Sequence, residues 1–246
     1  MPFHFKDIKL PQKIAPCPIE EAIIEFRFDS PFPPDAIFGI IFNQFKVDYP
    51  KAEPLPILQL PEVVRGQDPN LRFKPYYKLS KDESFLFQVG ARTFSLISLK
   101  PYCGWDVFSA KIQDVLTRVE KIQIVGNYLR LGIRYINRFD FNILKTIDLT
   151  LMMGKDTLVE LETNILLQIP SQLNGFRNTL RIANNAKIKK QDTEVIASII
   201  DIDTHIENPS KEKIVSLIDA GHLEEKKLFF SLLKEDFLEK ELNPVY

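Results

Sequence analysis

The sequence predicts an α+β fold, a curved antiparallel sheet or half-barrel that carries long helices on one face. Some stretches alternate apolar and polar residues, as strands do, and others repeat apolar residues at every third or fourth position, as helices do. The order strand, helix, three strands, helix occurs once before and once after residue 123. Repeated units of this kind tend to join their strands into one sheet that the helices cover.

The first half begins with alternating apolar residues in EEAIIEFRF, and prolines bound the helix that follows. In order, we expect a strand (20–28), a helix (35–49), a long irregular proline-rich connection (51–70), three strands (71–79, 85–89 and 93–99) and a helix (106–121). A connection of that length is uncommon inside a domain and is often functional.

The second half repeats this order. We expect a strand (128–141), a short helical piece within 141–153, three strands (158–169, 177–188 and 194–206) and a helical region (210–242) broken near Gly221. The chain is thus predicted to have an N-terminal tail (1–17) and a single domain (18–243) of two pseudo-repeats, 18–122 and 123–243. This order resembles the duplicated fold of the TATA-box-binding protein, a resemblance that implies no function.

Composition favours a cytoplasmic globular protein. The chain has 45% hydrophobic and 26% charged residues, which is close to the average for globular domains. A net charge of −1 argues against general binding of nucleic acids or membrane surfaces. Two cysteines are too few for a disulfide framework, and no glycine-rich phosphate-loop motif occurs. We expect neither a leader nor a membrane span. We expect no cofactor, no metal and no membrane partner.

Three arginines recur at every fourth residue of the strand expected at 128–141. Because side chains alternate across a strand, Arg130, Arg134 and Arg138 should project from one face, roughly 13 Å apart. That face is either a polar surface shared with carboxylates or a site for an anionic ligand.

The same alternation assigns further charged residues to this face. They are Glu21, Glu25 and Arg27; Glu160, Glu162 and Asn164; Arg177, Thr179 and Arg181; and Asp201, Asp203 and His205. We interpret the face as balanced in charge, with Arg134 and Arg138 neutralised from within. The candidate binding residues are Arg130, Arg134, Arg138, Glu25, Glu162, Arg181, Asp201, Asp203 and His205, and an external anion stays an alternative.

The last strand also suggests a metal. Asp201, Asp203 and His205 occupy alternate positions, and all three are ligands for divalent cations. Alternate residues of one strand lie roughly 6 to 7 Å apart, so the spacing is unspecific. A metal-assisted hydrolase that also uses Glu160 is therefore an alternative function.

Two phrases carry a resemblance to known proteins, KPYCGW at 100–105 and RYINR at 134–138. With the opening PIEEAIIEFRF and the late IIDID, they resemble a sporadically distributed family of uncharacterised bacterial and archaeal proteins, over residues 18–237. The resemblance implies a prokaryotic cytosolic protein and no assigned activity. The distribution of that family is similar to that of defence or toxin–antitoxin loci.

Both motifs also have a physical interpretation. Lys100, Pro101 and Gly104 suit a turn between strand and helix, where Tyr102 and Trp105 anchor the core. Cys103 is interpreted as a packed turn residue, with a reactive thiol as the alternative. Tyr135 and Asn137 point away from the arginines, so a buried Asn137 must be hydrogen-bonded, at a bulge or a strand end.

Three functions are consistent with these patterns. We favour a non-enzymatic binding protein whose partner is a protein, either a second copy or a neighbouring gene product, because no nucleophile and base are arranged together. The first alternative is nucleic-acid binding through Arg130, Arg134, Arg138, Arg177 and Arg181. The second is the metal-assisted hydrolase.

Overall fold

The computed structural model describes residues 5–6, 8–190 and 193–246. It is an α+β structure whose main sheet has nine strands, and every described pairing in that sheet is antiparallel. From end to end the strands are β2 (Lys51–Pro54), β3 (Tyr77–Ser80), β4 (Phe85–Val89), β5 (Thr93–Leu99), β1 (Ile19–Phe28), β6 (Tyr128–Phe139), β11 (Thr193–Glu207), β10 (Phe176–Lys190) and β9 (Thr163–Pro170). The predicted antiparallel sheet is confirmed, and the sheet is not closed.

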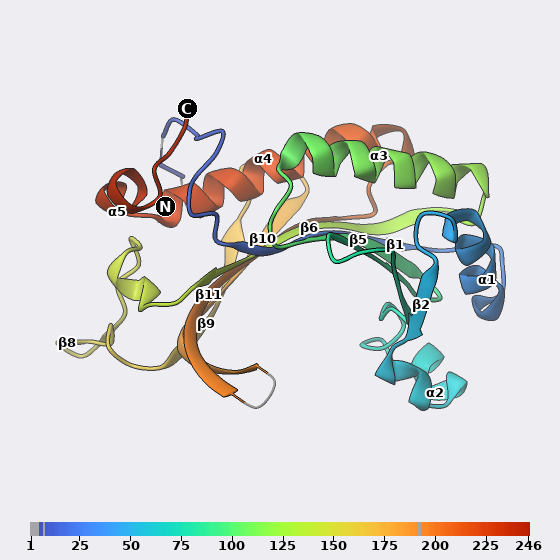
Figure 1. Cartoon of the computed structure of the whole chain (residues 1–246), viewed down its shortest axis with the longest axis horizontal. Helices are drawn as coiled ribbons and strands as arrows, with labels where there is room; N and C mark the ends of the chain where they lie inside the picture. Colours follow the sequence, from blue (N-terminus) through green and yellow to red (C-terminus); the bar gives the residue numbers. More distant parts are fainter. Residues whose placement is uncertain (1–4, 7, 191–192) are drawn as a thin grey trace. The chain divides into compact units, whose positions relative to one another are not determined.

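Helices and one small hairpin complete the fold (Figure 1). The α-helices are α1 (Pro34–Phe45), α2 (Glu62–Gln67), α3 (Trp105–Lys121), α4 (Ile214–Leu232) and α5 (Glu235–Glu241). Three short 3₁₀ segments, η1 (Pro56–Gln59), η2 (Ile143–Lys145) and η3 (Lys211–Lys213), and the hairpin of β7 (Met152–Met153) and β8 (Asp156–Thr157) lie between them. No helix in the described part of the chain has both the length and the apolarity that a membrane crossing requires.

The chain forms two compact units. Unit 1 contains Met1–Glu20, Arg134–Thr204 and Asp219–Tyr246, and unit 2 contains Glu21–Ile133 and His205–Ile218. Four elements, β1, β6, β11 and α4, contribute residues to both units. Unit 1 includes both ends of the chain, so the boundaries of the two units differ from those of the predicted pseudo-repeats. The duplication stays a prediction.

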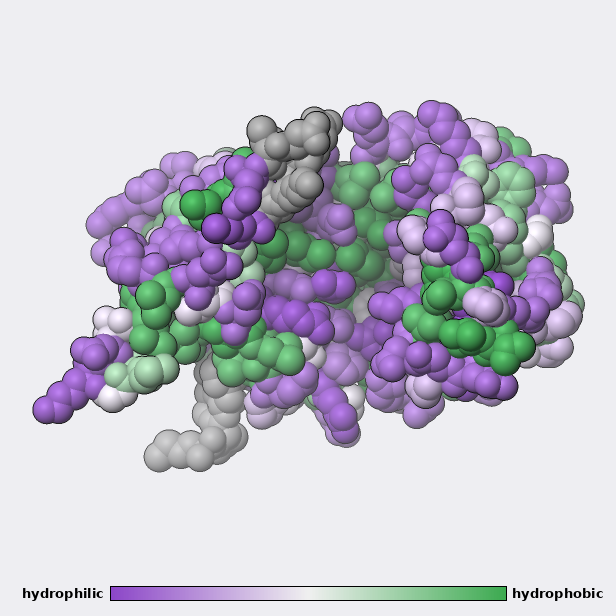
Figure 2. Space-filling view, turned by 90° about the horizontal axis from the view of Figure 1, so that it is seen from below, coloured by the Kyte–Doolittle hydropathy of each residue, from purple (hydrophilic) through white to green (hydrophobic). Residues whose placement is uncertain are grey.

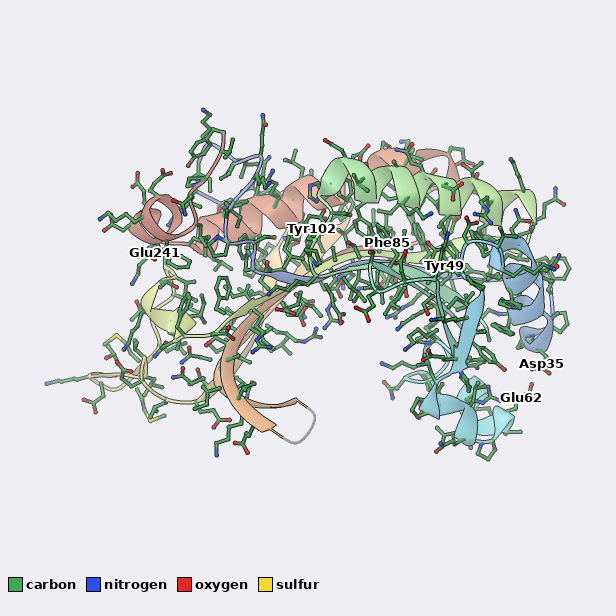
Figure 3. All side chains as sticks on the ribbon, in the orientation of Figure 1. Asp35, Tyr49, Glu62, Phe85, Tyr102 and Glu241 are labelled. Carbon is green, nitrogen blue, oxygen red and sulfur yellow. The ribbon has the colours of Figure 1, made fainter. Side chains whose placement is uncertain are left out.

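Helix α3 covers one face of the unit 2 strands (Figure 1). Its buried stripe consists of Phe108, Ile112, Val115, Leu116 and Val119. In Figure 3, Phe85 of β4 and Tyr102 before α3 both lie beneath this helix, and their rings lie 6.5 and 6.3 Å from the ring of Phe108. The alternation in β1 buries Phe26 against Phe94 of β5, with ring centroids 4.8 Å apart.

Unit 1 has its own core. Apolar residues of β6, β9, β10 and β11 pack there with the C-terminal part of α4 and with α5. Leu180 and Ile182 of β10 and Ile200 and Ile202 of β11 are almost fully buried. The residues between them therefore form the opposite face of the strands.

Some expected elements are wrong. The connection at 51–70 is not irregular throughout. Lys51–Pro54 pairs with β3 and so forms the edge strand β2, and Glu62–Gln67 forms the helix α2. Strand β3 begins only at Tyr77, and β9 begins only at Thr163. Gly221 lies inside α4, and the helical region breaks instead at Lys234, whose backbone is extended. A buried glycine costs a helix only about 1 kcal/mol, which packing offsets.

Candidate binding site on the arginine face

Strand β6 alternates as predicted. Tyr135, Asn137 and Phe139 are buried, whereas Arg134, Ile136 and Arg138 are half-buried on the opposite face. Figure 2 views the molecule from below the orientation of Figure 1, and hydrophilic residues occupy much of that view. Arg134 and Arg138 belong to unit 1 and Arg130 to unit 2, so the two groups are described in turn.

A buried carboxylate fixes two arginines in unit 1. Arg134 donates from Nε to Oδ1 of Asp201 and from Nη2 to Oδ2, both at 2.7 Å. Arg181 donates from Nη1 to the same Oδ2 at 3.4 Å. The Asp201 side chain is 8% exposed, whereas those of Arg134 and Arg181 are 38% and 50% exposed. We call these three residues the Asp201 cluster, and the bidentate bond sets the orientation of Arg134.

Aliphatic side chains lie beside this cluster. The register of β9 and β10 sets Leu166 opposite Arg181 and Gln168 opposite Thr179, and the Thr179 hydroxyl donates to Oε1 of Gln168 at 3.2 Å. By alternation, Ile136 of β6 and Ile199 of β11 share the face with Asp201. The described residues that β6, β9, β10 and β11 of unit 1 direct to this face include no aromatic side chain.

Arg138 and Asp203 lie further along the same face. Arg138 donates to Oδ1 of Asp140 at 2.9 Å from Nη2. Asp203 is half-buried and follows Asp201 by two residues, so both carboxylates project the same way. The internal neutralisation expected of Arg134 and Arg138 thus comes from Asp201 and from Asp140, a residue just beyond β6.

In unit 2, Arg130 lies flat on its strand. It is 7% exposed, and its Nη1 donates to Oε1 of Glu25 at 2.8 Å. The same Oε1 accepts from Nε of Arg27 at 2.7 Å, and Glu207 approaches Nε of Arg130 to 3.8 Å. A Cβ at Gly132 would lie 2.3 Å from Nη1 of Arg130, so the absent side chain of this glycine is what admits the guanidinium.

The expected positions of two acidic residues on the sheet face are wrong. Because β9 begins at Thr163, Glu160 and Glu162 precede the strand. Glu160 pairs with Lys145 at 2.8 Å, and Glu162 is exposed just before β9. His205 belongs to unit 2. Among the residues that the structure describes, no group of three or more His, Cys, Asp or Glu side chains is placed to hold a metal ion.

The KPYCGW motif forms the corner between β5 and α3 in unit 2. The peptide bond from Lys100 to Pro101 is cis, and Gly104 has φ +87°, a conformation that favours glycine. The rings of Tyr102 and Trp105 each meet Phe108 edge-on at 6.3 Å. Sγ of Cys103 lies 3.4 Å from the hydroxyl of Ser98, as a packed turn residue would.

The core side of unit 1 holds a polar network that the sequence did not reveal. Glu224 of α4 is 2% exposed and accepts from Oγ of Ser171 at 2.7 Å, from the backbone N–H of Gln172 at 2.9 Å and from Nδ2 of Asn178 at 3.1 Å. Thr204 donates to Oδ1 of Asn178 at 2.7 Å. Asn178 and Thr204 lie at positions where the alternation predicts apolar residues. Polar residues at such positions were the only sign of this network in the sequence.

Burial shifts the pKa of two titratable groups of α4 in unit 1 toward their neutral forms. Nδ1 of His222 lies 3.0 Å from the hydroxyl of Tyr135. Burial, with a smaller contribution from Lys226, lowers the pKa of His222 to about 3. Burial raises the pKa of the Glu225 carboxyl well above its usual value. Asn137 of the RYINR motif is also buried here and donates from Nδ2 to the carbonyl of Ile200 at 3.3 Å.

No protein-family model matches the chain, and a search of curated proteins finds no match. The resemblance based on KPYCGW and RYINR therefore stays a prediction, and functional inference depends on the geometry of the arginine face.

Proposed function

We propose that the chain is a non-enzymatic binding protein that holds an acidic segment of a protein partner against the Asp201 cluster. The observation that carries the proposal is the arrangement of Arg134 and Arg181. Both guanidiniums contact one buried carboxylate, and both side chains are more than a third exposed. The half-exposed guanidinium of Arg181 can bind a second carboxylate through N–H groups that lie in the same plane as its contact to Asp201.

Preorganisation makes such a site effective. Ordering a free arginine at an interface costs roughly 0.5 to 1.5 kcal/mol. The two bonds of 2.7 Å to Asp201 already order Arg134. Leu166 lies opposite Arg181 and is 61% exposed, so an acidic segment that also carries apolar side chains gains contacts beyond the charges.

The side chains around the cluster favour a protein over a nucleic acid. Binding of single strands relies on aromatic platforms for the bases, whereas the described neighbours on this face are the aliphatic Ile136, Leu166 and Ile199. The net charge of −1 points the same way, because sequence-independent nucleic-acid binding depends on positive charge.

The biological setting belongs to the same proposal. We infer a cytoplasmic prokaryotic protein, with a partner encoded by a neighbouring gene in a defence or toxin–antitoxin locus. The supporting argument is the resemblance carried by KPYCGW and RYINR. A duplicated ancestry similar to the TATA-box-binding-protein fold is part of this inference, and the repeated order of predicted elements supports it.

The test is a binding titration with a labelled peptide that alternates glutamate and leucine. We expect binding that weakens at least tenfold in Arg181→Met and weakens as salt rises toward about 1 M, where charges are screened beyond roughly 3 Å. Arg72→Met, which removes an exposed arginine of unit 2, is the matched control and should bind like the wild type.

Two outcomes contradict the proposal. One is the absence of peptide binding at low salt. The other is tight, salt-dependent binding of a single-stranded oligonucleotide that Arg181→Met abolishes, because that result assigns the same face to nucleic acid.

A further inference from the structure

The two end strands of the sheet differ in how they are protected. An end strand presents unpaired backbone groups, and proteins blunt such edges with short strands, charges and proline. Strand β2, KAEP, is four residues long and contains a lysine, a glutamate and a proline. Strand β9, TNILLQIP, is eight residues long, contains no charged residue and has its proline only at the end.

The unprotected edge is also apolar. In β9, the side chains of Leu166 and Leu167 are 61% and 37% exposed, and Ile165 is only partly buried against the unit 1 core. Strand β9 pairs with β10 on one side and ends the strand order of the described sheet on the other. A long, apolar edge of this kind is a template for a further strand.

We propose that two copies of the chain associate by pairing their β9 strands antiparallel, with Leu166 opposite Leu166 of the second copy. This proposal is independent of the binding function above. In a two-fold symmetric antiparallel pair, the same sheet face of both copies lies on one side. Because side chains alternate, even-numbered residues then lie opposite even-numbered ones and odd opposite odd. Centring the pair on Leu166 satisfies that condition.

This register is self-complementary over most of the strand. Ile165 meets Leu167 of the second copy on one face, and Asn164 meets Gln168 on the other. Glu162, exposed just before β9, meets Pro170, whose neighbour on β10 is the exposed Arg177. Thr163 meets Ile169, and at the other positions apolar residues face apolar ones, amides face amides, and an acidic residue approaches a basic one at both ends. These pairings identify the occupant of the edge as a second copy.

The register gives a sharp experiment, because position 166 faces itself. The probe is the full chain, whose mass is measured by light scattering across a hundredfold range of concentration, and we expect the wild type to form a dimer. Leu166→Lys and Leu166→Asp should each be monomeric, since like charges then meet at the centre of the pair. An equimolar mixture of the two variants should restore the dimer.

Matched variants test the ends of the strand and the fold. Glu162→Arg should weaken dimerisation at least tenfold, and the double variant Glu162→Arg with Arg177→Glu should restore it. Met153→Lys replaces a methionine that is 71% exposed in the β7–β8 hairpin and should leave the dimer intact. Thermal melting of the monomeric variants should remain cooperative, because residue 166 is exposed.

A wild type that is monomeric over the whole range overturns the proposal, as does a dimer that Leu166→Lys leaves unchanged. A mixture of the Lys and Asp variants that stays monomeric overturns the register centred on Leu166. The peptide titration with Arg181→Met does not depend on any of these results, so the two proposals fail separately.

Discussion

Arg130 and Arg134 are four residues apart on one strand but differ in exposure and in the carboxylates that surround them. Arg130 is 7% exposed, lies over Gly132 and contacts two carboxylates, Glu25 and Glu207. Arg134 is 38% exposed and contacts a carboxylate, Asp201, that it shares with Arg181. Where carboxylates surround the guanidinium, the arginine supports the fold. Where guanidiniums gather on one carboxylate, their side chains stay partly exposed.

The largest effect on stability is expected from Arg130→Met. Removing one partner of a buried ion pair leaves the other charge without compensation. Arg27 still reaches Glu25, and Glu25 is 26% exposed, so we expect a loss of about 2 kcal/mol in the free energy of unfolding, below the range of about 3 to 5 for fully buried pairs. Urea denaturation measures it.

Arg181→Met is the matched control from the other region. Its half-exposed side chain should contribute less than about 0.5 kcal/mol to stability. Equal losses in the two variants would contradict the distinction between a structural and a binding arginine.

A smaller effect is expected from Gly132→Ala. The added Cβ would meet Nη1 of Arg130 at 2.3 Å, so the guanidinium must move off Glu25. We expect a loss of about 1 to 2 kcal/mol, less than that for Arg130→Met because the displaced side chain can find solvent.

A double-mutant cycle identifies the cause. A methionine at position 130 forms no ion pair with Glu25 and can move away from a Cβ at position 132. In that background Gly132→Ala should change the free energy of unfolding little, so the effects of the two substitutions should be non-additive. Full additivity would show that Gly132 acts through the backbone instead.

The last prediction concerns the opposite face of unit 1, where burial favours the neutral forms of His222 and Glu225. Burial lowers the pKa of His222 to about 3, so the unfolded chain binds a proton that the folded chain does not, and stability falls as pH falls below about 6.5. Burial raises the pKa of Glu225, so the folded chain holds a proton that the unfolded chain releases, and stability falls as pH rises above about 4.3.

Between about pH 4.3 and 6.5, His222 and Glu225 change the free energy of unfolding in opposite directions as pH rises. Each contributes at most about 1.4 kcal/mol per pH unit. Relative to the wild type, His222→Gln should lose stability as pH rises from about 4.5 to 6.5, and Glu225→Gln should gain it. Thermal melting at a series of pH values measures both. Parallel profiles for the wild type and either variant would mean that the substituted group does not titrate on unfolding.

Periodicity predicted the regular elements well. The predicted helix at 106–121 is α3, Trp105–Lys121, and the predicted strands at 85–89 and 93–99 are β4 and β5. Strand β2 was missed because KAEP has no apolar face and becomes a strand only by pairing with β3. The start of β9 was missed because Val159 and Leu161 continue its apolar alternation into the preceding turn and bend.

The candidate site was predicted in kind but not in detail. Alternation within β6 and β11 correctly assigned Arg134 and Asp201 to one face. It could not separate Arg130 from Arg134, because their difference depends on which strands supply carboxylates, and pairing between distant strands is not written in local sequence. The buried contacts of Glu224 also depend on that pairing, since they join α4 to β10 and to the loop after β9.

The placement of Leu166 opposite Arg181 in the β9–β10 register has a consequence for avidity. If two β9 strands pair, the β10 strands lie three strand spacings apart, about 14 Å, so the Arg181 residues of the two Asp201 clusters lie at about that separation and project to the same side. Such a dimer is bivalent. A partner with two acidic segments at that separation would bind the second one at high effective concentration, so modest affinity at each cluster suffices for a long-lived complex.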